Sequence, residues 1–402
     1  MSLSLSLSLP EALTKLPRHP LSYPHASPIH ALPTLTTTLQ RPTAPQITLY
    51  AKREDHSSPL ACAGNKYRKL EYLIPDILHP TPSHNTAAYP GRPTTLVTEG
   101  AIQSNHTIQV ATVAQHLGLD AVAILHKGTG GGLAASSDRA AFLRTGNPHI
   151  LRLLGAEVHV LEPGSTAGGA RDPVKDIMDR VAASGRVPYW IPSGASLHPL
   201  GGVGYARAAF EIAAQERELF PAPAAGRFDY VFVACGSGST VGGLIAGFKM
   251  LEKMEMAGGR KATRPPRKVI GVVISPTKPR EWHEGRVLEF ARRAGRLIGL
   301  EDAEREITME DVRLDFRFVG AAYGVLDAET KDALAVMARE EGVILDPVYT
   351  AKVARGMMHW VQQGELARDY AMHDAARSGD GVNALFIHTG GQAALSAYAD
   401  VD

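Results

Sequence analysis

The feature that most constrains the fold is a regular alternation of short apolar segments with longer amphipathic segments along most of the chain. The segments with the length and residue types of strands are Ile47–Ala51, Thr94–Thr98, Ala121–His126, Glu157–Leu161, Pro188–Ile191, Tyr230–Ala234, Lys268–Ile274 and Ala384–Ile387. The segments with the apolar spacing of helices are Arg68–Leu78, Thr107–Leu117, His149–Leu154, Asp172–Ser184, Gly202–Leu219, Val241–Lys253, Lys331–Glu341 and Thr350–Gln363. This alternation predicts an α/β fold in which parallel sheets carry helices on both faces. Four segments rich in Pro, Gly or small polar residues are interpreted as loops, namely 20–45, 128–132, 258–268 and 375–381.

The charge balance and the cysteine count exclude several classes of protein. The 42 Lys and Arg nearly cancel the 41 Asp and Glu, so no overall field favours nucleic acid or an anionic membrane. No stretch of about 18 apolar residues is present, so no membrane span is expected. Two cysteines, Cys62 and Cys235, form no disulfide framework, and residues 1–9 lack the basic and apolar regions of a secretory signal. We therefore expect a cytoplasmic protein without nucleic-acid, membrane or metal partners.

A lysine-bearing turn, Gly64–Tyr72, is the first candidate for chemistry. It follows a predicted strand and opens a predicted helix. Glycine at position 64 allows the backbone to approach a ligand closely, and burial would lower the pKa of Lys66 enough to make its amine a nucleophile. Lys69, one turn further on, is a second candidate. The alternative is an exposed basic helix terminus with no chemical role.

The second candidate is the turn Gly100–Thr107, which also joins a predicted strand to a predicted helix. Backbone N–H groups at a helix N-terminus suit a carboxylate, and Ser104, Asn105 and His106 add directional hydrogen bonds. The alternative is helix capping by Ser104 or Asn105. Capping explains one of these residues but not the whole set.

The third candidate is the turn Cys235–Gly243, after the apolar strand at 230–234. Its glycines expose N–H groups and its hydroxyls add donors, which suits a phosphate at a helix N-terminus. No Gly-Lys-Ser/Thr follows, and Val241 occupies the third glycine position of the dinucleotide pattern, so nucleotide and NAD sites are disfavoured. A tight turn without a ligand remains the alternative. Thr350 and Thr389 place hydroxyls beside later element ends, either facing the ring nitrogen of a cofactor or serving as cap and turn residues.

Taken in order, these three turns and the segments around Thr350 and Thr389 resemble the fold-type-II pyridoxal 5′-phosphate (PLP) enzymes, and among them the 1-aminocyclopropane-1-carboxylate (ACC) deaminase and D-cysteine desulfhydrase group. The resemblance runs from about Pro17 to Tyr398. Its most similar stretches are Lys52–Asp55, Gly64–Tyr72, Ile102–Asn105, Pro192–Ser196, His198–Gly202 and Tyr323–Gly324. The resemblance implies a tryptophan synthase β-like fold with a large PLP-binding domain, residues 1–90 and 193–402, and a smaller inserted domain, residues 91–192. It also implies a homodimer and a small amino acid as substrate.

The resemblance implies a role for each candidate residue. Lys66 matches the Schiff-base lysine, and Asn105 matches the residue beside the phenolic oxygen of PLP. Ser104 matches the active-site serine, and the turn that it shares with Asn105 and His106 receives the substrate carboxylate. Tyr323 and Tyr349 match tyrosines that flank the substrate. The residues that match the phosphate loop are Ser237, Gly238, Ser239 and Thr240.

Two positions bear on the substrate. ACC deaminases carry Glu and Leu where this chain has Thr350 and Thr389, whereas D-cysteine desulfhydrases carry hydroxyl residues at both. A hydroxyl holds a proton on the ring nitrogen less well than a carboxylate, which favours β-elimination of D-cysteine to pyruvate, sulfide and ammonia. The surroundings of residues 52–75 and 198–202 favour the alternative, ACC deamination to 2-oxobutanoate and ammonia. Ile108 replaces an Arg usual in the family, which leaves open a PLP-binding protein without turnover or with an unusual substrate.

Overall fold

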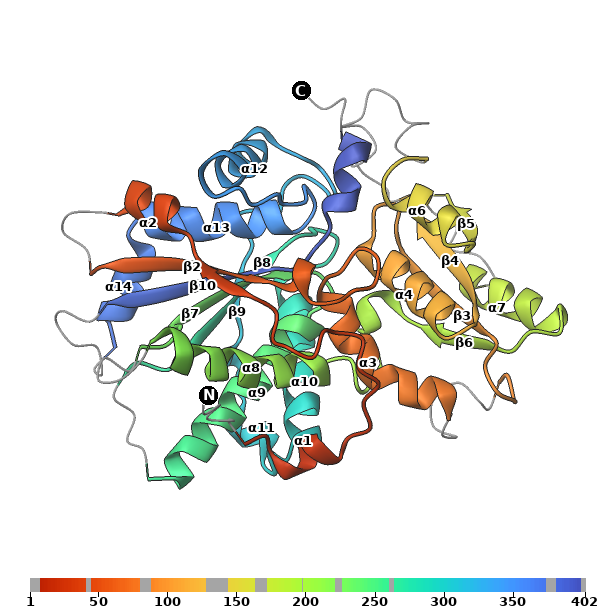
Figure 1. Ribbon diagram of the computed structural model, residues 1–402, viewed down its shortest axis with the longest axis horizontal. Coiled ribbons are helices and arrows are strands. Elements are labelled where there is room, and N and C mark those ends of the chain that lie inside the picture. The colour runs from red at the N-terminus through yellow and green to blue at the C-terminus, as the bar shows by residue number, and fades with distance from the viewer. Residues whose placement is uncertain are drawn as a thin grey trace.

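The computed structural model contains two separate sheets flanked by helices, as Figure 1 shows. The structure describes residues 8–40, 45–79, 88–127, 144–162, 172–196, 198–220, 226–259, 264–373 and 381–398. The predicted α/β class with parallel sheets is confirmed. The loop predicted at 128–132 and the start of the chain at 1–7 lie outside the described residues, as do most of the loop at 375–381 and residues 260–263 of the loop at 258–268.

The larger sheet has the strand order β1-β2-β10-β7-β8-β9 and is parallel except where β1 meets β2. Its strands are β1 (Ile29–Ala31), β2 (Ile47–Arg53), β10 (Val382–His388), β7 (Tyr230–Cys235), β8 (Lys268–Val273) and β9 (Arg313–Asp315). Every residue of β7 is buried, which explains its uninterrupted apolar sequence.

Helices cover both faces of this sheet. Because side chains alternate along a strand, the odd-numbered residues of β7 face one core and the even-numbered residues face the other. The first core is closed by α8 (Val203–Leu219), α9 (Ser239–Ala257) and α10 (Arg280–Leu297). The second core is closed by α2 (Pro33–Leu39), α12 (Ala328–Glu341), α13 (Thr350–Gln362) and α14 (Glu365–Ala371).

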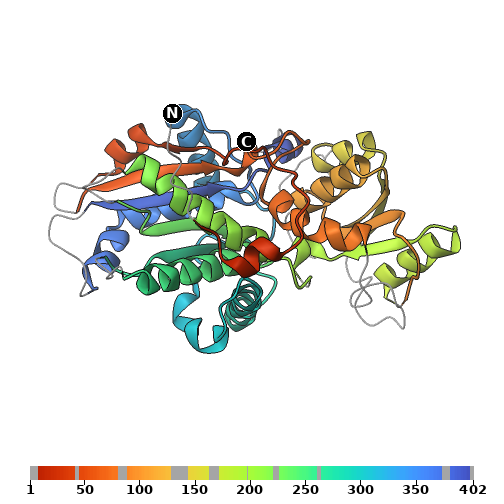
Figure 2. The same ribbon diagram turned by 60° about the horizontal axis from the view of Figure 1, so that its bottom comes forward.

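The smaller sheet lies beside the larger one in both views (Figures 1 and 2). Its strand order is β5-β4-β3-β6, all parallel. The strands are β5 (Glu157–Leu161), β4 (Asp120–His126), β3 (Thr95–Ala101) and β6 (Pro188–Ile191). The helices that pack on it are α3 (Asn65–Leu78), α4 (Asn105–His116), α6 (Asn147–Leu153) and α7 (Pro173–Ala183). Domain boundaries at 91 and 192 stay a prediction.

Several elements differ from the prediction, among them β9 and α14, which were assigned no structure from the sequence. The segment 20–45 is not all loop, because it contains β1 and α2, where Pro33 opens the helix and Leu35 and Leu39 are buried one turn apart. Helix α10 was assigned no structure from the sequence. The remaining short elements are α1 (Glu11–Lys15), η1 (Glu54–His56), η2 (Ser193–Ala195), α11 (Ala303–Glu306), η3 (Met309–Asp311) and η4 (Gln392–Tyr398). None of the described helices is both long enough and apolar enough to cross a membrane.

A buried network of charges holds α3 against α8. Arg68 of α3 pairs with Glu54 and, at 2.8 Å between Nη2 and Oε1, with Glu211 of α8. Lys52 of β2 also pairs with Glu211, at 2.7 Å. Opposite charges lower the pKa of Glu211 against the effect of its burial. Loss of one of these side chains would leave a buried charge with fewer partners, which is strongly unfavourable. Because Arg68 lies on α3, the network holds in place the helix that carries Lys66.

Candidate active site

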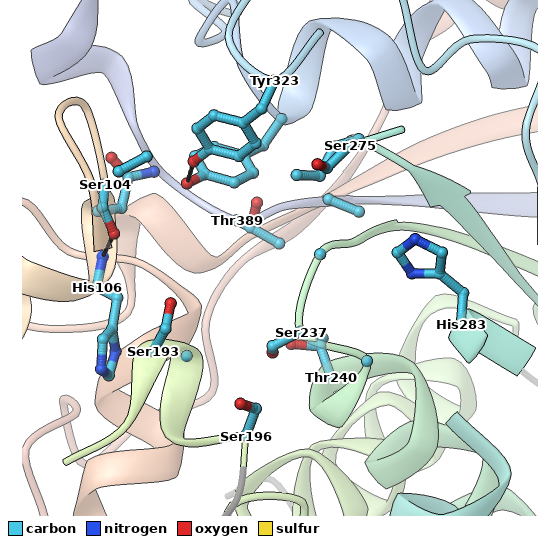
Figure 3. A pocket seen from close by; sticks show the side chains of 18 of the residues that line it. Ser104, His106, Ser193, Ser196, Ser237, Thr240, Ser275, His283, Tyr323 and Thr389 are labelled. Carbon is cyan, nitrogen blue, oxygen red and sulfur yellow. Dashed lines mark hydrogen bonds between the residues drawn. The ribbon is translucent and has the colours of Figure 1, made fainter. Parts of the chain in front are cut away.

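A cavity of about 330 Å³ lies where strands of both sheets end. Its walls come from the segments that follow β3, β6, β7, β8 and β10 at their carboxyl ends. Open α/β sheets bind ligands at this edge, since the loops there converge and helix N-termini point inward. Figure 3 shows Ser104 and His106 on one side of the cavity, Ser237 and Thr240 on another, and Tyr323 above them.

Lys66 lines the cavity from the first turn of α3, and contacts from both sheets hold its backbone. Its own N–H and that of Tyr67 donate to Oε1 of Gln109 in α4, at 3.1 and 3.2 Å. The N–H of Asn65 donates to the carbonyl of Thr389, 3.2 Å away. A Cβ on Gly64 would lie 2.5 Å from that carbonyl oxygen, so only glycine allows the two segments to approach so closely.

The amine of Lys66 is prepared to act as a nucleophile. Protein atoms crowd around it, and this burial lowers its pKa to about 8. Lys69, the second candidate, is fully buried behind the cavity wall, where its Nζ donates to Ser239 Oγ at 2.9 Å. Burial and the neighbouring Lys66 lower the pKa of Lys69. Of the two lysines, only Lys66 reaches the cavity.

The turn that opens α4 brings three predicted residues to the cavity wall: Ser104, Asn105 and His106. Ser104 also caps the helix, because its Oγ accepts a hydrogen bond from the N–H of His106 at 3.2 Å. Asn105 Oδ1 accepts a hydrogen bond from Nδ2 of Asn147, 3.1 Å away. Burial, with the charges of Lys66 and then Lys69, lowers the pKa of His106, so its ring is neutral.

Two tyrosines close the cavity on the side of the larger sheet. The hydroxyls of Tyr323 and Tyr349 share a hydrogen bond, and the rings meet edge to face with centroids 6.0 Å apart. Burial raises the pKa of Tyr349, and the hydroxyls of Tyr323 and Ser104 oppose part of that rise. Burial also raises the pKa of Tyr323. Both phenols therefore keep their protons at neutral pH.

The predicted phosphate turn also lies on the cavity. Ser237, Gly238 and Thr240 line the wall, whereas Ser239 does not, because its Oγ is bonded to Lys69 and faces the carbonyl of Gly194. Gly238 has φ +89°, and no side chain caps the helix α9 that it opens. The first N–H groups of α9 are thus left for another acceptor.

The two threonines that bear on the substrate occupy different environments. Thr389 lines the cavity. Thr350, the first residue of α13, does not line it, because its Oγ1 donates to Oδ1 of Asp346, four residues earlier, at 2.6 Å. This position gives no support to the expected contact between Thr350 and a cofactor, which stays a prediction. Ile108, where relatives were expected to carry Arg, is fully buried in α4 and is not part of the cavity wall either.

Some residues of the cavity wall were not singled out from the sequence. Four of these residues come from the segment after β8 and from α10, the helix that the sequence analysis left unassigned: Ser275, Trp282, His283 and Arg286. The signal was available, since Val287, Phe290, Ala291 and Ala294 are spaced like one face of a helix and are buried. Ser193 and Ser196, noted only within a resembling stretch, also line the cavity.

The described wall suits an anionic cofactor that bears an aldehyde. It includes Lys66, Lys278 and Arg286 but no Asp or Glu among the described residues that form it. It also offers an uncapped helix N-terminus and a lysine of lowered pKa. Lys66 would hold the aldehyde of PLP, and the turn at 236–240 would hold its phosphate. In the described part of the chain, no group of three or more His, Cys, Asp or Glu side chains is placed to hold a metal ion.

These features define a PLP enzyme, and the chain belongs to the family described as "Pyridoxal-phosphate dependent enzyme", whose model matches residues 24–373. The chain is 38% identical over 387 residues to a 1-aminocyclopropane-1-carboxylate deaminase of Ralstonia nicotianae, covering 96% of this chain and 98% of the relative. It is 37% identical over 389 residues to the deaminase of that name from Burkholderia multivorans, covering 97% and 98%.

Solved structures agree with this family. A crystal structure described as an ACC deaminase homologue superposes with a TM-score of 0.70 at 28% identity, covering 97% of this chain and 96% of the other. An O-ureido-L-serine synthase, with a TM-score of 0.52 at 17% identity over 98% and 96%, shares the fold. The expected fold type II architecture and the expected PLP cofactor are thus confirmed.

Proposed function

We propose that this chain is a PLP-dependent deaminase that converts ACC to 2-oxobutanoate and ammonia. The observation that carries the proposal is that Lys66, Ser104 and Tyr349 line one cavity in a chain that matches ACC deaminases over nearly its whole length. These relatives favour ACC as the substrate. In the sequence, Thr350 and Thr389 instead favoured D-cysteine. The structure weakens the case from position 350, since Thr350 does not reach the cavity.

The residues of the cavity divide the work of binding and proton transfer. Bound PLP supplies a ring that accepts electrons from the substrate's α-carbon. The N-terminal turn of α4 offers N–H groups and the Ser104 hydroxyl to the substrate carboxylate. Lys66, whose pKa is lowered to about 8, can take and return a proton at Nζ.

The tyrosine pair supplies a second proton-handling group on the same cavity. Tyr349 Oη is bonded to Tyr323 Oη, and burial keeps the proton on it at neutral pH. A neutral phenol can donate a proton to the substrate carbon that becomes negative as the cyclopropane opens. The phenol of Tyr323, which is hydrogen-bonded to that of Tyr349, can then return a proton to it. Tyr349 Oη is therefore assigned the proton that completes ring opening.

D-Cysteine is the second candidate substrate, and Thr389 is the observation that favours it. The hydroxyl residue at this position lines the cavity, and no described carboxylate lines it to hold a proton on the ring nitrogen. Elimination of a thiolate, a good leaving group, needs a weaker electron acceptor than opening a cyclopropane. The products would be pyruvate, sulfide and ammonia.

The test measures 2-oxo acid and sulfide from ACC, D-cysteine and L-cysteine, together with the visible absorption of the protein. Wild type is expected to be yellow and to form 2-oxobutanoate from ACC, and Lys66→Ala is expected to lose both properties. Lys331→Ala is the control, since Lys331 is exposed on α12 and does not line the cavity. Sulfide from D-cysteine without 2-oxobutanoate from ACC would replace the first proposal by the second. A yellow protein that forms no 2-oxo acid from any of the three would contradict both and favour a binding protein without turnover.

We further propose that the protein is a homodimer and acts in the cytoplasm on a small amino acid. The monomer mass is 43.0 kDa, so light scattering coupled to size-exclusion chromatography should give twice that mass. A mass equal to one chain at micromolar concentration would contradict the proposed dimer.

A further inference from the structure

We propose that Arg286 of α10 binds the phosphate of PLP and supplies the positive charge that the hydroxyl-lined turn at 236–240 lacks. This inference rests on the confirmed cofactor and is independent of which amino acid is the substrate.

The guanidinium of Arg286 lies at the phosphate turn. Its Nε donates to the carbonyl of Ser237 at 3.3 Å. Its Nη2 donates to Ser196 Oγ at 2.9 Å. Ser196, Ser237 and Arg286 all line the cavity, so this guanidinium joins the turn after β6 to the turn after β7 at the cavity wall.

Aromatic rings hold this guanidinium in place. Trp282 lies one turn before Arg286 and Phe290 lies one turn after it, and both rings face its Cζ, with centroids 4.9 and 5.4 Å away. Guanidinium groups bind favourably to aromatic faces, and the contacts reduce the number of conformations that the side chain can adopt. Arg286 is therefore positioned before a ligand arrives.

No carboxylate forms an ion pair with Arg286, and Glu289, three residues further along α10, acts on its charge only at longer range while it pairs with Arg293. Within the described parts of the chain, no Asp or Glu oxygen lies within 4 Å of its guanidinium, and none lines the cavity. Its two hydrogen bonds go to neutral acceptors, and both hydrogens of Nη1 remain for a ligand. Partial burial without an anion is unfavourable for a cation, and a phosphate dianion at the adjoining helix N-terminus would remove that cost.

A purely structural role is the competing explanation, since Arg286 also connects three elements. The two roles differ in what they predict for ligands with and without phosphate. A phosphate-binding arginine discriminates PLP from pyridoxal, which keeps the aldehyde and the ring but lacks the phosphate. An arginine that only connects α10 to the two turns affects both ligands alike.

The experiment measures equilibrium binding of PLP and of pyridoxal to the full-length protein, freed of cofactor, by visible absorption in the absence of substrate. The variants are Arg286→Met, Arg286→Lys and a control, Arg293→Met, two turns further along α10, where the native arginine pairs with Glu289. Arg286→Met is expected to weaken PLP binding about 10- to 100-fold, as for loss of one charged hydrogen-bonding group. Pyridoxal binding is expected to change less than about twofold, and Arg286→Lys should fall between wild type and Arg286→Met.

Equal weakening of PLP and pyridoxal in Arg286→Met would overturn the proposal in favour of the structural role. Unchanged PLP binding, or an equal loss in the Arg293→Met control, would overturn it as well. If Arg286→Met does not fold, Arg286→Lys decides the question through the ratio of the two dissociation constants. Because no substrate is present, a failure of this inference is distinct from a failure of the proposed deaminase activity.

Discussion

The lowered pKa of Lys66 predicts how fast PLP attaches to the protein at each pH. Only the neutral amine attacks the aldehyde. With a pKa of about 8, about a tenth of the Lys66 side chains are neutral at pH 7, against about one in 3,000 for an ordinary lysine of pKa 10.5. Burial favours the neutral form, so its fraction rises about tenfold per pH unit below pH 8 and levels off above it.

The assay mixes cofactor-free protein with PLP and records the visible band of the protein-bound cofactor between pH 6 and pH 10. The rate is expected to rise up to about pH 8 and then to become constant. Nα-Acetyl-lysine, whose side-chain amine is free, is treated in the same way as the reference for an unperturbed amine. Its rate of reaction with PLP should still be rising at pH 10. Lys69→Met separates the two lysines, since it should keep the band, whereas Lys66→Ala should abolish it.

A rate that keeps rising to pH 10 for the protein would refute the reasoning, because it would show that the environment of Lys66 does not disfavour the ammonium. A band retained in Lys66→Ala but lost in Lys69→Met would refute the assignment of the reactive lysine.

Three further predictions concern single residues. Gly64→Ala should sharply weaken PLP binding, because the added Cβ would lie 2.5 Å from the carbonyl oxygen of Thr389. Gly285→Ala is the control, since a Cβ at that position has no atom within 4 Å. The control substitution should stabilise α10 by about 0.5–1 kcal/mol, measured by urea unfolding. Similar PLP binding by both variants would contradict this. Glu211→Ala should lower the free energy of unfolding by about 3–5 kcal/mol, because it leaves buried cations with fewer partners, and a loss below about 1 kcal/mol would disprove the coupling. Tyr349→Phe should lower kcat for ACC by about 10²–10⁴-fold with the PLP spectrum intact, and an unchanged kcat would exclude proton transfer from this phenol.

Most of the parallel α/β architecture could be predicted from the sequence because its elements carry strong local patterns. The strand at 230–235 is apolar throughout since it is covered on both faces, and α4 begins with a serine that caps it. Helix α10 and the short helix α2 were missed. The first has mostly charged residues between its buried positions, and the second lies within a segment whose prolines suggested only turns.

The candidate site was predictable to the extent that single turns carry the chemistry. The three turns that follow predicted strands do meet at one cavity, because the carboxyl ends of parallel strands converge. The direction of individual side chains was not predictable. Thr350 turns toward Asp346, four residues earlier in the same turn, and Ser239 turns toward Lys69, which is 170 residues away in the sequence. Arg286 could not be placed at the site without knowing the path of α10.

The backbone around Lys66 is anchored to two structural units at once. Gln109, in a helix that packs on the smaller sheet, accepts a hydrogen bond from the N–H of Lys66. Asn65, the residue before Lys66, donates a hydrogen bond to the carbonyl of Thr389, just after a strand of the larger sheet. A displacement of either sheet relative to the other would therefore shift the reactive nitrogen with respect to the turn at 236–240. The visible spectrum of the bound cofactor therefore depends on the position of the two sheets relative to each other. A distant substitution that disturbs the packing between the sheets should alter this spectrum even when every side chain of the cavity is unchanged.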